Sequence, residues 1–349
     1  MRNIFKILFG LIIIFQIQSC KTAKPVESNT FYKIDNLLQT DQPRNFNGVV
    51  VISKNEKLIY DKAIGFADIE HKTPLKTTDR FSSMSIAKQV TATLVMLEVE
   101  NGKIDVNSPI KNYLPDLKYD WANKVTVHHL LNNTSGLDSW ELNENLLFEP
   151  GTQFKYSNVG YALLGQILEN ASGKKYSELV NFLFLKVGMN NSFYPNENSK
   201  IVQSYFNSTK NGRSLVTEFP LKKEFFPGSN LTISALDLVK WNLALHDGKI
   251  LKKENYQKMI HYSITNTHEL FSEKPIGYGY GLRINDKQGF VEYGHTGFMP
   301  TAGFTAVNLY YPKNKISVVV LENQATDNFD IAYYFEEQIR KIVLKNFEK

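Results

Sequence analysis

Hydrophobic and polar residues alternate near both ends of the chain, and this pattern predicts strands there. Residues 46–53 and 57–65 read as two strands joined by a hairpin turn over residues 54–56. The alternation returns late in the chain in four segments, at residues 279–284, 290–293, 304–310 and 316–321. Their short connections, such as residues 312–315, favour antiparallel pairing.

Helical periodicity dominates between these two groups of strands. Residues 85–100 lack Gly and Pro and are apolar on nearly every face, which predicts a helix buried in the interior and ending at Asn101-Gly102. Residues 103–245 read as helices and loops. Further helical patterns lie at residues 126–131, 159–168 and 176–185, with a closing helix at about 329–344.

Strands at both ends with helices between them favour an α+β or α/β fold. We expect one antiparallel sheet built from N- and C-terminal strands and flanked by helices, with a mostly helical lobe inserted between the two groups of strands. A cleft between the sheet and this lobe is the default place for a functional site.

The first twenty residues have the pattern of a targeting segment. Arg2 and Lys6 precede an apolar run, residues 7–15, that is too short to span a membrane comfortably, so residues 1–19 are expected to be a signal peptide. Residues 17–20, Ile-Gln-Ser-Cys, resemble the lipobox of bacterial lipoproteins, which implies cleavage before Cys20 and lipidation of its thiol. The alternative is an ordinary signal peptide with an incidental cysteine.

This interpretation divides the chain into three parts. Residues 1–19 would be removed, residues 20–29 would be the lipidated cysteine and a polar tether, and residues 30–349 would form the folded domain. A lipid anchor would place the protein in a bacterial cell envelope, attached to a membrane and facing the periplasm or the exterior.

Composition excludes several classes of protein. Of the 349 residues 42% are hydrophobic and 13% aromatic, which is far from a disordered composition. Forty Lys and Arg against 35 Asp and Glu give a net charge of +5 without a basic stripe, so no nucleic-acid partner is expected. Cys20 is the only cysteine, and the adjacent His128 and His129 would diverge on a helix, so we expect no metal and no cofactor.

The first candidate site is a serine three residues before a lysine, Ser85-Ile-Ala-Lys88. Residues i and i+3 share a face of a helix, and a desolvated lysine can take the proton of a serine nucleophile. The same spacing occurs at Ser172 and Lys175, where the sequence favours a solvated loop. Placement at the start of the buried helix therefore favours Ser85.

Two further motifs carry groups suited to the same chemistry. Tyr156-Ser-Asn158 combines a phenol that can move a proton with an amide that can orient a substrate, although Tyr-x-Asn also begins at Tyr194 and Tyr205. The third motif, residues 295–297, is His-Thr-Gly and follows the predicted strand 290–293. Its side chains can hold a substrate carboxylate, and its glycine lets a substrate approach the strand closely. The alternative is a histidine beside a turn with no role.

In this order, the motifs resemble those of the penicillin-recognising serine hydrolases, and more closely those of their class C β-lactamase and D-alanyl-D-alanine carboxypeptidase branch. Longer blocks are similar as well, at residues 81–88, 127–137, 149–165 and 293–300. The resemblance covers about residues 35–325. It implies that Ser85 is the acylated nucleophile and that Lys88 and Tyr156 share the proton transfers.

The resemblance also implies the substrate-binding groups. Asn158 would position the substrate amide, while His295 and Thr296, with Gly297 beside them, would line the opposite wall. The backbone N–H groups of Ser85 and Phe298 would form the oxyanion hole.

Several positions depart from the family pattern. Class C β-lactamases usually carry Lys where this chain has His295, which resembles the carboxypeptidases, D-aminopeptidases and esterases instead. Asn133 stands where a His is common, in a segment we interpret as structural. Phe298 is bulky and could narrow the acyl pocket. Arg283 could pair with a substrate carboxylate or be a solvated strand residue.

We therefore expect a monomeric serine hydrolase that acts on amide or ester bonds of a peptide or other small molecule. Its candidate substrates are D-Ala-ended or other peptides, β-lactams and esters. Two alternatives stay open, a carboxylesterase of the same fold and a non-catalytic wall-binding lipoprotein, but every catalytic position is filled.

Overall fold

The computed structural model describes residues 25–196, 198–267, 271 and 274–347. The expected signal peptide and Cys20 lie outside these residues. Helix α1 (Pro25–Leu38) overlaps the end of the expected polar tether, so residues 25–29 are helical. The tether itself stays a prediction. Within the described part of the chain, no helix is both long and apolar enough to cross a membrane.

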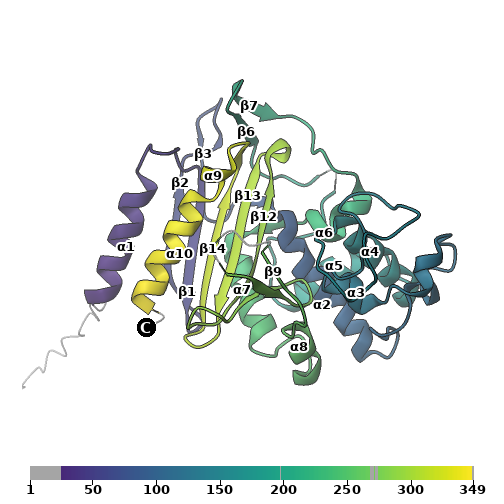
Figure 1. Ribbon diagram of the computed structural model, residues 1–349. Helices are drawn as coiled ribbons and strands as arrows, with labels where there is room; N and C mark the ends of the chain where they lie inside the picture. The colour runs from purple at the N-terminus through teal and green to yellow at the C-terminus, as the bar shows by residue number, and fades with distance from the viewer. Residues whose placement is uncertain (1–24, 197, 268–270, 272–273, 348–349) are drawn as a thin grey trace, which may run out of the picture.

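One antiparallel sheet of eight strands organises the described chain (Figure 1). In spatial order its strands are β2 (Lys57–Ile64), β1 (Gly48–Lys54), β14 (Ile316–Glu322), β13 (Phe304–Tyr311), β12 (Glu292–Met299), β11 (Arg283–Asn285), β10 (Ile276–Tyr278) and β9 (Thr265–Asn266). Val51 of β1 lies opposite Asp61 of β2 on one side and Val319 of β14 on the other. The expected sheet, built from N- and C-terminal strands, is confirmed.

Helices cover both faces of this sheet, which explains why its central strands β1, β13 and β14 are buried along almost their whole length. In chain order the remaining helices are α2 (Ala87–Glu100), α3 (Val127–Leu131), α4 (Asn158–Ser172), α5 (Tyr176–Lys186), α6 (Phe226–Ser229), α7 (Ala235–His246), α8 (Lys253–Met259), α9 (Phe329–Ala332) and α10 (Tyr334–Phe347). Single 3-10 turns are η1 (Met84–Ile86), η2 (Ile110–Asn112), η3 (Asp120–Asn123), η4 (Lys223–Phe225) and η5 (Pro300–Ala302).

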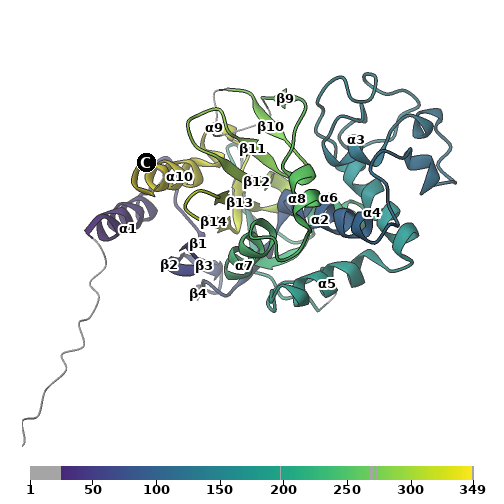
Figure 2. The same ribbon diagram turned by 90° about the horizontal axis from the view of Figure 1, so that it is seen from below.

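The two faces of the sheet bury different cores. Val50 and Val318 point toward α1 and α10, which lie side by side on one face in both views (Figures 1 and 2). Val49 and Val319, one residue along, point toward α2, α7 and the helical lobe on the other face. This alternation is the two-residue period of a strand.

Three short sheets complete the fold. They are β15 (Gln324–Thr326) with β6 (Ser204–Ser208) and β7 (Gly212–Val216), β3 (Phe66–Asp68) with β4 (Thr73–Pro74), and β5 (Arg80–Ser82) with β8 (Thr232–Ser234). The prediction that residues 103–245 hold only helices and loops is therefore wrong. Strands of three to five residues with several polar side chains do not show a clear period.

Two predicted strand positions need correction where they bear on the site. Residues 279–284 are not one strand, because β10 ends at Tyr278 and β11 begins at Arg283, with Gly281 at a φ of +67° in the turn. The strand expected at 290–293 continues to Met299 as β12. The His-Thr-Gly motif therefore lies inside a strand, not after one.

Arg44 fastens the segment before β1 to the C-terminal part of the chain. Its guanidinium donates two hydrogen bonds to Glu322, from Nη1 at 2.8 Å and Nη2 at 2.7 Å. It also donates to the carbonyls of Ile331 at 2.9 Å and Ala332 at 2.8 Å, at the corner between α9 and α10. Both side chains are largely buried, so each charge depends on the other.

Replacing Arg44 with methionine should destabilise the fold by about 3–5 kcal/mol, because it leaves the Glu322 carboxylate buried without its partner. Urea unfolding followed by circular dichroism measures this loss. The exposed Arg213 of β7 provides a control, since Arg213→Met should change stability by less than about 0.5 kcal/mol. Equal stabilities for Arg44→Met and the wild type would contradict this account of the corner.

Candidate active site

Ser85 lies on a tight turn between β5 and the buried helix α2. The preceding residue, Met84, has a φ of +45°, a left-handed conformation that is unusual for a residue other than glycine and is often found at active sites. This turn packs against β12. A Cβ at Gly297 would lie 2.5 Å from Met84 Cβ and 3.0 Å from Ser85 N. Gly297 thus leaves room for the turn that carries Ser85. The sequence had suggested that it leaves room for the substrate instead.

Lys88 is fully buried one turn after Ser85. Its amine lies 3.4 Å from Ser85 Oγ and donates to Asn158 Oδ1 at 2.7 Å and to the carbonyl of Gly228 at 2.5 Å. Burial holds the pKa of Lys88 well below its usual range, and the nearby positive charge of Arg283 lowers it further.

These partners suit a neutral amine. A neutral lysine has two N–H donors and one lone pair, and Asn158 and Gly228 supply one fixed acceptor for each donor. With both donors occupied, the lone pair of Lys88 Nζ points toward Ser85 Oγ. The arrangement can take the hydroxyl proton of the serine without any rearrangement of the lysine.

Tyr156 completes the group around the nucleophile. Its ring centroid lies 4.6 Å from Lys88 Nζ, and its hydroxyl shares a hydrogen bond with Ser85. Burial raises the pKa of Tyr156 to about 12, although Arg283 and the bond with Ser85 act in the opposite direction. The phenol is therefore protonated at neutral pH, so it suits the role of proton donor or relay better than that of a base.

The loop that carries Tyr156 is held by Asn133. Asn133 Oδ1 accepts from the backbone N–H of Ser157 at 3.0 Å, and its carbonyl accepts from that of Lys155 at 2.9 Å. Asn133 itself is buried at a φ of +59°, a conformation that Asn tolerates better than most residues. These bonds support the structural interpretation of its segment.

Asn158 begins α4 and lines the cavity beside Ser85. Ser157 caps this helix, because its hydroxyl accepts from the N–H of Gly160 at 3.0 Å. The side-chain oxygen of Asn158 receives the Lys88 bond, and its Nδ2 donates to Ser139 Oγ at 3.4 Å. The sequence suggested only a substrate contact for Asn158 and gave no sign that it also holds the lysine.

His295 and Thr296 lie on opposite faces of β12, because neighbouring strand residues alternate. Thr296 lines the cavity, but His295 is fully buried and does not. The Nδ1 of His295 donates to the carbonyl of Thr296 at 2.6 Å, and its Nε2 lies 3.0 Å from the hydroxyl of Tyr278. Its ring centroid lies 6.1 Å from that of Tyr156. His295 is therefore not among the residues that line this cavity, and its ring packs beside that of Tyr156. A direct contact between His295 and substrate stays a prediction.

A cavity of about 320 Å³ opens at Ser85. Its lining residues are Met84, Ser85, Trp140, Tyr156, Asn158, Ser229, Thr267, Arg283, Thr296, Phe298, Met299, Phe329 and Tyr333. Arg283 is only 8% exposed, so the alternative of a solvated strand residue is wrong. Trp140, Phe329 and Tyr333 were missed because they belong to no motif.

The edge of β12 is open toward this cavity. β11 pairs with residues 292–294 only, whereas β13 pairs with residues 293–299 on the other side. Among the described residues, the stretch from His295 to Met299 thus has a strand on one side alone. An open edge of this kind can bind an extended peptide by main-chain hydrogen bonds.

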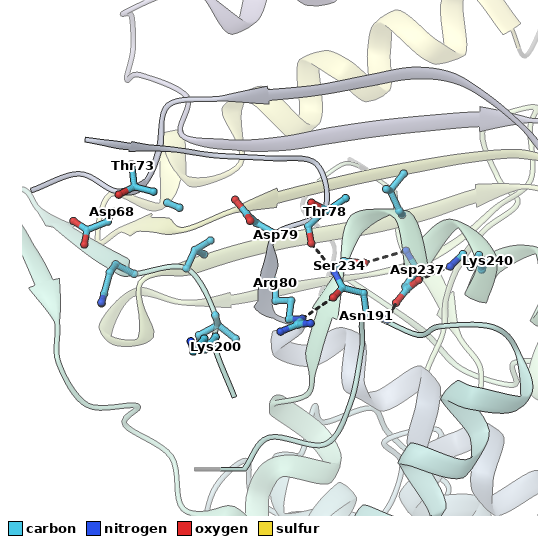
Figure 3. A pocket seen from close by; sticks show the side chains of 15 residues that line it. Asp68, Thr73, Thr78, Asp79, Arg80, Asn191, Lys200, Ser234, Asp237 and Lys240 are labelled. Carbon is cyan, nitrogen blue, oxygen red and sulfur yellow. Dashed lines mark hydrogen bonds and ion pairs between the residues drawn. The ribbon is translucent and has the colours of Figure 1, made fainter. Parts of the chain in front are cut away.

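A larger hollow of about 850 Å³ shares no lining residue with the cavity at Ser85. Figure 3 shows this hollow. Its polar groups bind one another, with Asn191 between Arg80 and Asp237. The Nε of Arg80 donates to Asn191 Oδ1 at 2.7 Å, and Lys240 pairs with Asp237 at 2.7 Å. The serine that lines it, Ser234, caps α7 by accepting from the N–H of Asp237 at 3.3 Å, and none of the three motifs lies here, so this hollow is not the candidate active site.

The other Ser-x-x-Lys and Tyr-x-Asn segments have structural roles. Ser172 ends α4 and Lys175 precedes α5, on either side of the left-handed Gly173. Tyr194 packs on Tyr176 with ring centroids 5.9 Å apart, and the hydroxyl of Tyr205 accepts from the N–H of Ile69 at 2.7 Å. These contacts separate the copies from the site at Ser85.

Comparison with known proteins agrees with this geometry. The family model described as Beta-lactamase matches residues 34–339. Penicillin-binding protein 4* of Bacillus subtilis is 25% identical over 324 residues, which cover 82% of this chain and 70% of that protein. A D-amino acid amidase from Ochrobactrum anthropi has a similar structure, with a TM-score of 0.78 at 21% identity over 91% of this chain and 99% of that one.

A class C beta-lactamase is also similar in fold, with a TM-score of 0.75 at 20% identity over 92% of this chain and 98% of that one. The family match covers most of the chain and includes all three motifs. The chain therefore belongs to the beta-lactamase family, and it is a serine hydrolase with the fold shared by penicillin-binding proteins and class C beta-lactamases.

Proposed function

We propose that this protein hydrolyses amide or ester bonds through an acyl-enzyme on Ser85. The observation that carries the proposal is the buried amine of Lys88, whose two donors are held by fixed acceptors while its third direction faces Ser85 Oγ. Lys88 takes the hydroxyl proton as Oγ attacks the substrate carbonyl carbon. The backbone N–H groups of Ser85 and Phe298 stabilise the oxyanion that forms.

Collapse of this intermediate breaks the bond to the leaving group and forms an ester on Ser85. The departing nitrogen or oxygen receives the proton that Lys88 holds, with protonated Tyr156 as the relay between them. Water then attacks the ester and gives up a proton to the same groups. As the C–O bond to Ser85 breaks, Oγ receives this proton and the acid is released. Both half-reactions use one proton carrier, so each turnover restores the starting state.

The polar groups of the cavity support a substrate with an amide or ester bond and an anionic group. Arg283 and Thr296 form a cationic, hydrogen-bonding wall that suits a carboxylate, and Asn158 offers an amide to the substrate. D-Ala-ended peptides, other small peptides and β-lactams share these features. His295 contributes by supporting the ring of Tyr156.

The lipobox-like segment supports a location in the cell envelope. Cys20 would carry the lipid after removal of residues 1–19, and the folded domain, residues 30–349, would follow a short segment after it. Candidate substrates of the wall would then be within reach of the tethered enzyme. The monomeric state stays a prediction.

Two alternatives differ from this proposal in measurable ways. A carboxylesterase would form the same acyl-enzyme but turn over only esters. A non-catalytic wall-binding lipoprotein would form none, although the contacts of Lys88 and Tyr156 with Ser85 favour catalysis. An adduct on Ser85 therefore separates both enzymes from the lipoprotein, and turnover of amide substrates separates the proposed enzyme from a carboxylesterase.

Ser85→Ala should abolish covalent labelling by a fluorescent penicillin and by a fluorophosphonate, because both reagents need the serine oxygen. Gel fluorescence of the purified protein measures the adduct. Ser172→Ala, the matched change in the other Ser-x-x-Lys segment, should label like the wild type. Labelling by neither probe in the wild type would leave the non-catalytic lipoprotein as the better reading.

Lys88→Met should lower the acylation rate by about 10²–10⁴-fold, since it removes the base and keeps a similar volume. In the wild type, acylation should rise with pH as Lys88 loses its proton, over a range well below the usual lysine pKa. Arg283→Gln removes a positive charge that favours the neutral amine, so this rise should move to higher pH.

Stopped-flow acylation rates across pH test both statements, with Arg213→Gln as a remote control. A profile that is identical for Arg283→Gln and the wild type would contradict the proposed influence of Arg283 on Lys88. Full acylation rates in Lys88→Met would contradict its role as the base.

Cys20→Ser should release the protein from membranes, because the lipobox-like segment would lose the residue that takes the lipid. Detergent phase partitioning of the protein expressed in bacteria, with and without the substitution, measures the anchor. Lys21→Ser leaves the cysteine in place and serves as the control. Equal partitioning of the Cys20→Ser variant and the wild type would contradict a lipid anchor at Cys20.

A further inference from the structure

One wall of the catalytic cavity consists of aromatic rings that the chemistry at Ser85 does not use. Phe298, Phe329 and Tyr333 form this aromatic wall. The ring centroid of Phe298 lies 6.0 Å from that of Phe329 and 5.5 Å from that of Tyr333. The wall joins β12 to the short helix α9 and the residue that follows it.

Phe329 is an apolar side chain that is 58% exposed to solvent. Trp140 lines the same cavity and is 39% exposed, with its ring edge against Phe225 at a centroid distance of 5.4 Å. The two rings come from distant parts of the chain yet meet at one cavity. Exposed apolar surface gathered in this way marks a place where an apolar ligand group is bound.

The position of the aromatic wall relative to the polar groups gives the cavity two unlike ends. Thr296 and Phe298 share a face of β12, and Arg283 lies opposite Gly294 on the neighbouring strand. Four residues of extended strand, about 13 Å, separate Gly294 from Phe298. The backbone N of Ser85 lies against Gly297, near the apolar end.

We propose that the substrate carries an aromatic or similarly bulky apolar group that packs against the aromatic wall and Trp140 while its reacting carbonyl lies at Ser85. This inference rests on the proposed function and narrows its substrate class. A substrate with only a methyl group would leave these rings facing water in the complex and would gain nothing from them. Burial of a phenyl group here would contribute to binding in the transition state and thus to kcat/KM.

Matched pairs of substrates test the proposal on either side of the reacting bond. Acetyl and phenylacetyl nitrophenyl esters place the phenyl group in the acyl part. Acetyl esters of lactate and phenyllactate place it in the leaving group, beside a carboxylate for Arg283. In at least one pair we expect kcat/KM to favour the phenyl compound by about tenfold or more.

Two variants tie this preference to the rings. Phe329→Ala and Trp140→Ala should each lower the preference for the phenyl compound, the ratio of the two kcat/KM values in a pair, about threefold or more. Phe182→Ala, which removes a ring 70% exposed on α5, should leave the preference unchanged. An equal loss for both members of a pair would indicate a structural role and overturn the proposal.

Mass spectrometry of the acylated protein tests the acyl transfer on Ser85 separately from the apolar subsite. A Ser85 adduct with no preference in either pair would overturn the apolar subsite and leave the proposed acyl transfer intact. No adduct with any of the four esters would overturn both.

Discussion

The amine of Lys88 lies among three oxygens, those of Ser85, Asn158 and Gly228, and none of its side chain is exposed to water. A charged ammonium in that position would lose its hydration, and Arg283 adds a second positive charge nearby. The neutral amine avoids both costs and keeps a lone pair for the serine. The reactivity of Ser85 thus follows from the burial of Lys88.

The fold provides this environment by bringing together segments that are far apart in the chain. α2 supplies Lys88, the start of α4 supplies Asn158, and α6 supplies the carbonyl of Gly228. Close approach needs residues without side chains at the contact points. A Cβ at Gly228 would lie 3.2 Å from Lys88 Nζ, and a Cβ at Gly281 would lie 2.4 Å from the carbonyl of Lys88. These two glycines therefore let α6 and the turn before β11 pack closely against Lys88.

Local patterns in the sequence were sufficient to predict much of this arrangement. The period of residues 85–100 predicted α2, and alternation at the two ends predicted a sheet shared by both. The spacing of Ser85 and Lys88 placed the nucleophile and its base on one face. Gly228 could not be predicted, because the carbonyl that holds Lys88 belongs to a four-residue helix without a motif. The burial of His295 could not be predicted either, because the sequence predicted that the strand ends before the motif, whereas β12 continues through it to Met299.

The protonation state of Lys88 is the central claim, and NMR of the protein labelled with ¹³C at lysine Cε measures it directly. The Lys88 resonance, assigned by its loss in Lys88→Met, should titrate well below the usual lysine pKa of about 10.4 and show a neutral amine at the pH where Ser85 is acylated. A resonance that titrates at the ordinary lysine value, with Lys88 charged throughout the active pH range, would contradict the account.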